Sequence, residues 1–154
     1  MKTICQVRRF VSFFLPSIFA LTFIVVLAIP ALANQPISQF TPGLLCTAQM
    51  PDFKGFAYPS QIPLCQRNIS YGEKVHISQN YHIDESQWRN VEFDHLIPLC
   101  AGGANDVRNI WPEALDQAHL KDQVENQVCI GLRDGTITQQ QAVNAMFQFL
   151  KQHP

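Results

Sequence analysis

The residues of this sequence that could do chemistry are an Asp-His pair and a later histidine. Asp94 and His95 lie near the start of a strand-like run, and a turn, a short strand and a helix that carries His119 follow. In such a unit the helix packs back across the hairpin, so we expect His119 to face the strand that carries Asp94 and His95. One carboxylate and one imidazole that converge on a point would supply two ligands for a divalent cation and leave positions for water and phosphate oxygens. The second histidine, unligated, would serve as general base near neutral pH.

The strands that must position these residues are read from apolar alternation. Residues 91–99 form a β-type run, and 101–103 form a turn. Residues 109–111 form a very short strand that Pro112 stops. Upstream, the alternation over 74–83 predicts short strand pieces.

Two helices are expected after these strands. Asp116 is the expected N-cap of a helix over 117–129, and Thr138 with Gln141 resembles a capping box for a last helix. The first of them has an apolar stripe and the second an apolar face, formed by Leu120, Val124 and Val128 and by Ala142, Val143, Met146, Phe149 and Leu150. Strands followed by helices predict one α+β domain.

An ordered motif runs through this region. Its segments are Glu92-Phe93-Asp94-His95-Leu96-Ile97-Pro98-Leu99, Gly102-Gly103, Asn105-Asp106 and Arg108-Asn109-Ile110-Trp111-Pro112-Glu113. They resemble the HNH endonuclease family, whose pattern runs D-H-x-x-P, a Gly-Gly loop, N-L-x-P and then a helix with the last His or Asn. The continuation Ala118-His119-Leu120-Lys121-Asp122 with Glu125 resembles a secreted bacterial subgroup. The resemblance covers residues 65–150 and is sharpest over 92–125.

The resemblance implies a role for each matching residue. His95 would be the general base that takes a proton from the attacking water, and Asp94 and His119 would hold the metal. Asn109 would hold the loop through backbone hydrogen bonds and so orient His95. Glu92 would lie on the same strand face as Asp94 and could touch the metal or orient a ligand.

The resemblance also implies a fold, a cofactor and a substrate. The fold would be α+β with a ββα-metal (HNH) core, an irregular N-terminal arm, an extra C-terminal helix and bracing disulfides. The cofactor would be one divalent ion, with Mg²⁺ favoured over Mn²⁺, Ni²⁺ or Zn²⁺, and the substrate DNA, with RNA as an alternative. Arg108 and Lys121, which flank the motif, are candidates for phosphate contacts.

The first 33 residues have the pattern of a secretory leader. Three basic residues precede the uncharged stretch Phe10–Ile29, and Ala31-Leu32-Ala33 offers a cleavage site. An uncleaved membrane anchor is the alternative, which would make the protein membrane-tethered. With the leader removed we expect an exported protein, periplasmic or secreted, without stable membrane association. The expected organisation is a signal peptide over 1–33, an irregular Pro/Gly-rich arm over 34–64 and a nuclease domain over 65–154.

The charge balance argues against binding of nucleic acid by bulk electrostatics. Of 154 residues, 47% are hydrophobic and 15% charged, which excludes wholesale disorder. Residues 34–154 keep eight of the 11 Lys and Arg and all 12 Asp and Glu, a formal charge of −4. Any contact with a polyanion must therefore come from a local site.

Four cysteines remain after the leader, an even number that indicates two disulfides in an exported chain: Cys46, Cys65, Cys100 and Cys129. Their pairing stays open, and their wide spacing disfavours structural zinc. A second hypothesis for the whole protein is a disulfide-braced binding module on the same fold without catalysis.

Overall fold

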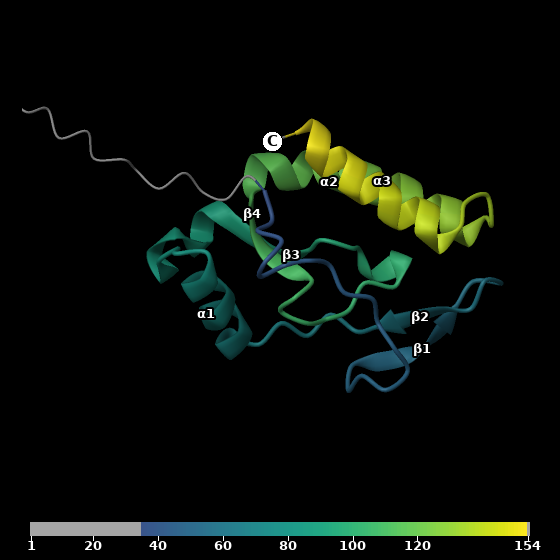
Figure 1. The fold of residues 1–154 in the computed structure, drawn as a ribbon, viewed down its shortest axis with the longest axis horizontal. Helices are drawn as coiled ribbons and strands as arrows, with labels where there is room; N and C mark the ends of the chain where they lie inside the picture. The colour runs from purple at the N-terminus through teal and green to yellow at the C-terminus, as the bar shows by residue number, and fades with distance from the viewer. Residues whose placement is uncertain (1–34, 154) are drawn as a thin grey trace, which may run out of the picture.

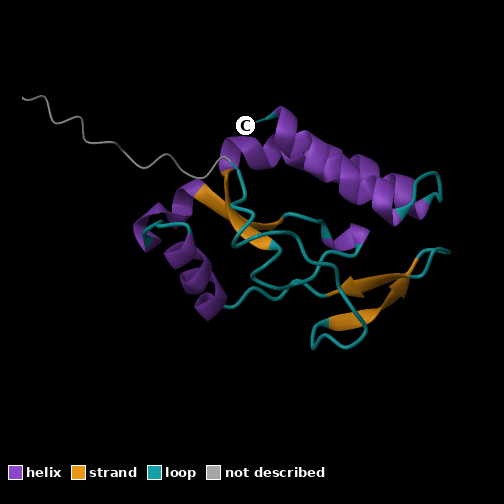
Figure 2. Ribbon diagram, viewed as in Figure 1, coloured by secondary structure: helices purple, strands orange, loops and turns teal. Residues whose placement is uncertain are grey.

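The computed structural model describes residues 35–153, so the predicted leader over 1–33 lies outside it. The described chain is a mixed α+β structure with two small antiparallel sheets, three α-helices and two short 3-10 helices (Figures 1 and 2). The α+β prediction is confirmed at this level. Between Gln35 and His153, no helix is long and apolar enough to cross a membrane.

A hairpin followed by a helix forms the centre of the fold. Strand β3 (Val91–His95) pairs antiparallel with β4 (Ile110–Ala114), with His95 opposite Ile110, and α2 (Leu115–Arg133) begins directly after β4. The prediction that Pro112 stops the strand is wrong, because Pro112 pairs with Phe93 within β4. A two-stranded sheet leaves the outer edge of β4 without a partner, and proline is tolerated on such an edge.

Helix α3 (Gln139–Gln152) packs along α2, as Figure 1 shows. Its capping box at Thr138 and Gln141 is confirmed. Helix α2 differs from the prediction: its N-cap is Ala114, and Asp116 lies inside its first turn. The predicted stripe fails at Leu120, which is 47% exposed.

The segment predicted as strand pieces over 74–83 is instead helix α1 (Tyr71–Asn80). Ser70 accepts a hydrogen bond from the backbone of Glu73, and the Glu73 side chain accepts from the backbone of Ser70. This capping box satisfies free N–H groups of the first turn. Apolar alternation over so few residues was too weak a signal to outweigh this capping box. Ile77, which the alternation assigned to a strand, is a buried residue of α1.

The N-terminal arm contains a hairpin that the sequence analysis missed. Strands β1 (Phe53–Ala57) and β2 (Ile62–Cys65) pair antiparallel, so the predicted boundary between 64 and 65 falls inside β2. The irregular part of the arm is joined to the central loop by backbone bonds: the N–H of Cys46 donates to Gly102 at 2.7 Å and that of Ala104 to Leu44 at 2.8 Å.

Both predicted disulfides are present, and their pairing is now defined. Cys46 bonds to Cys65 and ties the arm to β2, and Cys100 bonds to Cys129 and ties the loop after β3 to α2. Their Cα–Cα distances are 5.8 Å and 5.6 Å. Stable disulfides are typical of oxidising compartments, which agrees with a location outside the cytoplasm.

Candidate functional site

A small hollow of about 190 Å³ opens where the end of β3 faces the middle of α2. Asp94 and His95 line it from β3, Glu125 and Cys129 line it from α2, and Arg67 enters from the segment before α1. Since the Cys100–Cys129 disulfide forms part of its wall, a covalent bond joins the loop and the helix at this point.

The neighbours of His95 define which of its ring nitrogens carries the proton. Asn105 accepts the backbone N–H of Asn68 on its Oδ1 at 3.1 Å and donates its Nδ2 to the Asn68 carbonyl at 3.1 Å. Its orientation is therefore fixed, and Oδ1, which lies 3.3 Å from Nε2 of His95, must act as acceptor. In neutral His95 the proton is thus on Nε2, and Nδ1 keeps a free lone pair.

His95 is neutral at physiological pH. Burial lowers the pKa of its ring to about 4, and the opposing effect of Asp94, whose carboxylate lies 4.0 Å from Nδ1, does not offset it. A neutral imidazole with one unprotonated nitrogen is the form that a general base requires.

Arg67 and Lys121 bind the carboxylate of Asp94 from opposite segments. The Arg67 guanidinium donates to Oδ1 of Asp94 at 3.0 Å and to the Phe93 carbonyl at 2.8 Å, and lies 3.4 Å from Glu92. Lys121 donates to Oδ2. Burial by itself raises the pKa of Asp94, but these two cations outweigh it, so the pKa lies below its usual value. Asp94 is therefore ionised.

Lys121 is the centre of a buried charged cluster. Its ammonium contacts Asp94, lies 2.5 Å from Glu125 and lies 3.2 Å from Glu113. The contact with Glu113 is an ion pair without hydrogen-bond geometry, which leaves both Glu113 oxygens without a hydrogen-bond partner. Burial raises the pKa of Glu113 to about 7, against the opposing effect of Lys121. Burial likewise raises the pKa of Glu125.

Asn109 holds the loop between the two strands, as predicted. Its Oδ1 accepts the N–H of Ile97 at 3.0 Å, and its Nδ2 donates to the carbonyls of Ile97 and Ala104 at 3.0 Å and 2.9 Å. The loop runs so close to itself at Gly103 that a Cβ there would overlap the Ile97 carbonyl. The glycine and the amide together fix the backbone that follows His95.

The structure brings together only part of the predicted site. Asp94 and His95 line the hollow, and Glu92 lies beside Asp94 through their shared partner Arg67. The prediction that His119 faces Asp94 is wrong, because His119 is exposed on α2. Lys121 faces Asp94 in its place.

The two predicted phosphate contacts also need revision. Lys121 has an exposed fraction of 0%, so a phosphate cannot reach its ammonium, and that prediction is wrong. Arg108 is exposed and its guanidinium binds Asp106 at 2.8 Å, with no part in lining the hollow. Arg67 is the cation that the hollow presents.

The donor set does not fit the single divalent ion that the resemblance implies. Among residues 35–153, no group of three or more His, Cys, Asp or Glu side chains is placed to hold a metal. The expected partner His119 points elsewhere, and the Asp94 oxygens contact Arg67 and Lys121. We therefore derive no step through a metal.

Sequence reasoning gave no role to Arg67, Asn105, Glu113 or Glu125. Asn105, Glu113 and Glu125 stood inside the motif or its continuation, so their position was a usable signal. Arg67 lies 27 residues before Asp94 in a segment without a motif, and only folding places it at β3.

No protein-family model, curated protein or solved structure matches this chain. The chemistry of the site therefore has to be argued from its own residues.

Proposed function

We propose that this protein is an exported endonuclease of the HNH type that hydrolyses phosphodiester bonds of DNA, with RNA as a second substrate. One observation carries the proposal: neutral His95, with Nδ1 unprotonated, lines the same hollow as the half-exposed Arg67. A general base activates the attacking water and a cation binds the phosphate, and hydrolysis of a phosphodiester uses both groups side by side. The ordered motif of β3, the Gly-Gly loop, β4 and α2 supports the ββα core of that class.

The proposed chemistry assigns a task to each of these residues. The Arg67 guanidinium binds non-bridging oxygens of the phosphate and stabilises the charge that develops on them. Nδ1 of His95 takes a proton from water as the water oxygen attacks phosphorus. The bond to the leaving oxygen breaks, that oxygen takes up a proton from solvent, and His95 later releases its own. The products are a phosphate monoester and an alcohol.

A bound phosphate would also bring His95 closer to the working range of a base. Its pKa of about 4 is that of the site without a bound phosphate, and a further negative charge beside the ring, in addition to Asp94, favours the imidazolium. The formal charge of −4 over residues 34–154 disfavours attraction of the whole protein to DNA. Arg67 is a local cation that can hold one phosphate without such attraction.

The test is cleavage of plasmid DNA and of a single-stranded circular DNA by the oxidised protein, with Mg²⁺, Mn²⁺, Ni²⁺ or Zn²⁺ added in turn and with EDTA. We expect His95→Ala to lower the cleavage rate by about 10²–10⁴-fold. His76→Ala is the matched control, because His76 is exposed on α1 and does not line the hollow. No cleavage by folded protein under any condition would favour the non-catalytic binding module. Cleavage that survives His95→Ala would show that another group is the base.

The EDTA arm and His119→Ala test the predicted metal together. Since His119 is exposed and does not line the hollow, we expect His119→Ala to leave cleavage unchanged with each added metal and with EDTA. Loss of metal-dependent cleavage in this variant would instead support the Asp94–His119 pair that the resemblance implies.

A further inference from the structure

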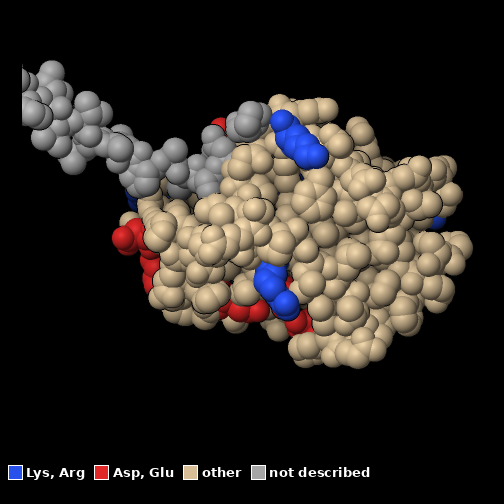
Figure 3. Space-filling view, viewed as in Figure 1, with Lys and Arg blue, Asp and Glu red and all other residues tan. Residues whose placement is uncertain are grey.

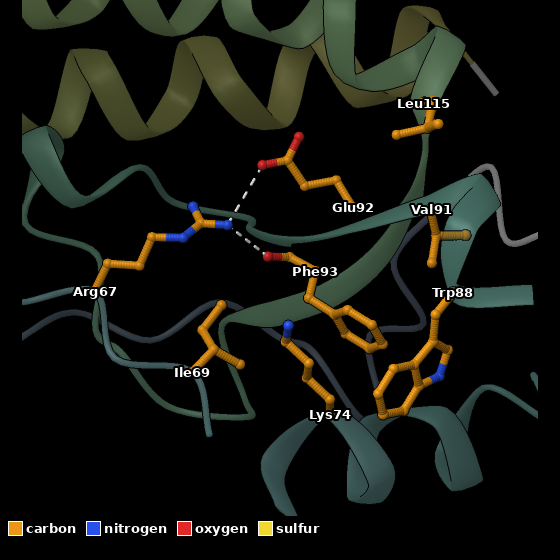
Figure 4. Close-up of a pocket in the computed structure, with 8 residues that line it drawn as sticks. All are labelled: Arg67, Ile69, Lys74, Trp88, Val91, Glu92, Phe93 and Leu115. Atoms are coloured by element: carbon orange, nitrogen blue, oxygen red, sulfur yellow. Dashed lines mark hydrogen bonds and ion pairs between the residues drawn. The ribbon is translucent and has the colours of Figure 1, made fainter. Parts of the chain in front are cut away.

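A second and larger hollow adjoins the candidate site. Its volume is about 450 Å³, within the range of small-molecule sites. Arg67 lines both hollows and is the link between them. Figure 4 shows Arg67 on one side, beside Glu92 and the backbone of Phe93, with Lys74, Phe93 and Trp88 on the other.

Aromatic rings form one wall of this second hollow. Trp88, on the 3-10 helix before β3, meets Phe93 edge to face, with ring centroids 5.2 Å apart and an interplanar angle of 81°. The Trp88 Nε1–H donates to Oγ of Ser78 on α1 at 2.7 Å. This bond holds one edge of the indole against α1.

Two cations border the aromatic wall. The ammonium of Lys74, on α1, lies 5.6 Å from the centre of the Phe93 ring, and Figure 4 shows it directed toward that ring. No carboxylate binds Lys74 in the part of the chain that the structure describes, whereas Arg67 is shared with Glu92 and Asp94. Lys74 is therefore available to an incoming anion.

We propose that this hollow binds an unpaired nucleotide of a single-stranded nucleic acid, next to the phosphate held by Arg67. The base would lie against Trp88 and Phe93, and Lys74 would contact the adjoining phosphate. The combination of an aromatic wall with bordering cations is typical of sites for single-stranded nucleic acid. This inference rests on the proposed function and names its substrate class.

The recessed position of the wall is what excludes a duplex. Phe93 is buried and Trp88 is half-buried, so a ligand must enter the hollow to touch them. Bases in a duplex are stacked on one another, and their faces become accessible only when a nucleotide leaves the stack. A single strand can place one base there without that cost.

Tryptophan fluorescence of the full chain gives a direct test. The chain has two tryptophans, and Trp111 has an exposed fraction of 0%, so a stacked base can quench only Trp88. The probe is an eight-nucleotide oligothymidylate, added to the His95→Ala chain, which lacks the proposed base, so that cleavage is suppressed. We expect saturable quenching by the single strand, and none by a G·C-rich hairpin duplex that stays paired under the conditions of the assay or by deoxyribose 5-phosphate.

A lysine series supplies the matched variants. We expect Lys74→Gln to weaken binding of a fluorescein-labelled oligothymidylate about tenfold and to lower the slope of log K against log salt by about 0.7, the value for one phosphate contact on a single strand. Lys74→Arg should restore the slope, and Lys151→Gln, at an exposed position of α3, should match the parent chain. Equal quenching by duplex and single strand, or an unchanged slope in Lys74→Gln, would overturn the proposal.

The outcomes separate this inference from the proposed function. Cleavage of either DNA by the wild-type chain without quenching by the oligonucleotide would support the nuclease and rule out the nucleotide subsite. Quenching without cleavage of either a plasmid or a single-stranded circular DNA by the wild-type chain would keep the subsite and assign the protein to nucleic-acid binding alone.

Discussion

The ammonium of Lys121 contacts the carboxylate of Asp94 inside the protein, where Lys121 has an exposed fraction of 0%. This contact joins α2 to β3 at the place where the sequence predicted a histidine and a metal. Glu113 and Glu125 complete the surroundings of the same ammonium. One buried positive charge thus stands among three carboxyl groups.

Removing the positive charge of Lys121 should make the protein unfold at a much lower urea concentration. We expect Lys121→Met to lower the free energy of unfolding by about 3–5 kcal/mol, because it leaves buried carboxylates without a counter-charge. Urea denaturation at pH 7.5 measures it. The control is Lys151→Met at an exposed position of α3, for which we expect a change within about 0.5 kcal/mol. Equal stability of the two variants would contradict the assigned role of Lys121.

Glu113 should make stability depend on pH. Its folded pKa of about 7 lies above the usual 4.5, so the folded chain binds more protons than the unfolded chain between these values. The contribution of Glu113 is therefore fully present below about pH 4.5 and is lost as pH rises through about 7. Glu113→Gln cannot titrate, so we expect its stability relative to wild type to be higher at pH 8 than at pH 5.

The comparison of these two chains isolates Glu113 from His95. The lowered pKa of His95 acts in the opposite sense, since its contribution is lost as pH falls from about 6.5 to about 4. His95 is present in both chains, so its effect cancels in their difference. A difference that does not vary between pH 5 and pH 8 would show that Glu113 is not shifted.

Asn109 should be sensitive even to a conservative change. Asn109→Asp keeps the acceptor for the Ile97 N–H but replaces the donor to two carbonyls with an oxygen. We expect a loss of about 3 kcal/mol, because buried groups lose their partners. Thermal unfolding of Asn109→Asp beside Asn126→Asp, at an exposed position on α2, measures it. Similar melting temperatures would argue against the role of Asn109 in holding the loop.

Loss of either disulfide should lower stability by a similar amount, but loss of only one of them should lower the cleavage rate. Their sequence separations of 19 and 29 predict a loss of about 3–4 kcal/mol for each pair changed to serine. Only the Cys100–Cys129 bond lines the candidate site, so its removal should also lower cleavage at a temperature where both variants are folded. Equal cleavage by the two double variants would show that the Cys100–Cys129 bond does not shape the site.

Local signals predicted much of the fold around the site. The order of strand, Gly-Gly loop, strand and helix depends on features that lie close together in the chain, such as the glycines of the turn and the Thr138 capping box. The existence of two disulfides followed from an even number of cysteines, whereas the loop bonds of Asn109 were implied only by the resemblance of the motif to a known family. Short apolar alternation was a weak signal, and helix α1 replaced the strands it suggested.

The sequence by itself determined which residues stand at the end of β3 and that a helix follows β4. Only the tertiary structure decided which side chain of that helix faces them. His119 and Lys121 are two residues apart, which turns them by about 200° around an α-helix, so only one can point at Asp94. The face of α2 that points at Asp94 also carries Glu125, one turn beyond Lys121. Arg67 depends on folding in the same way, because its contact with Asp94 joins segments that no local pattern connects.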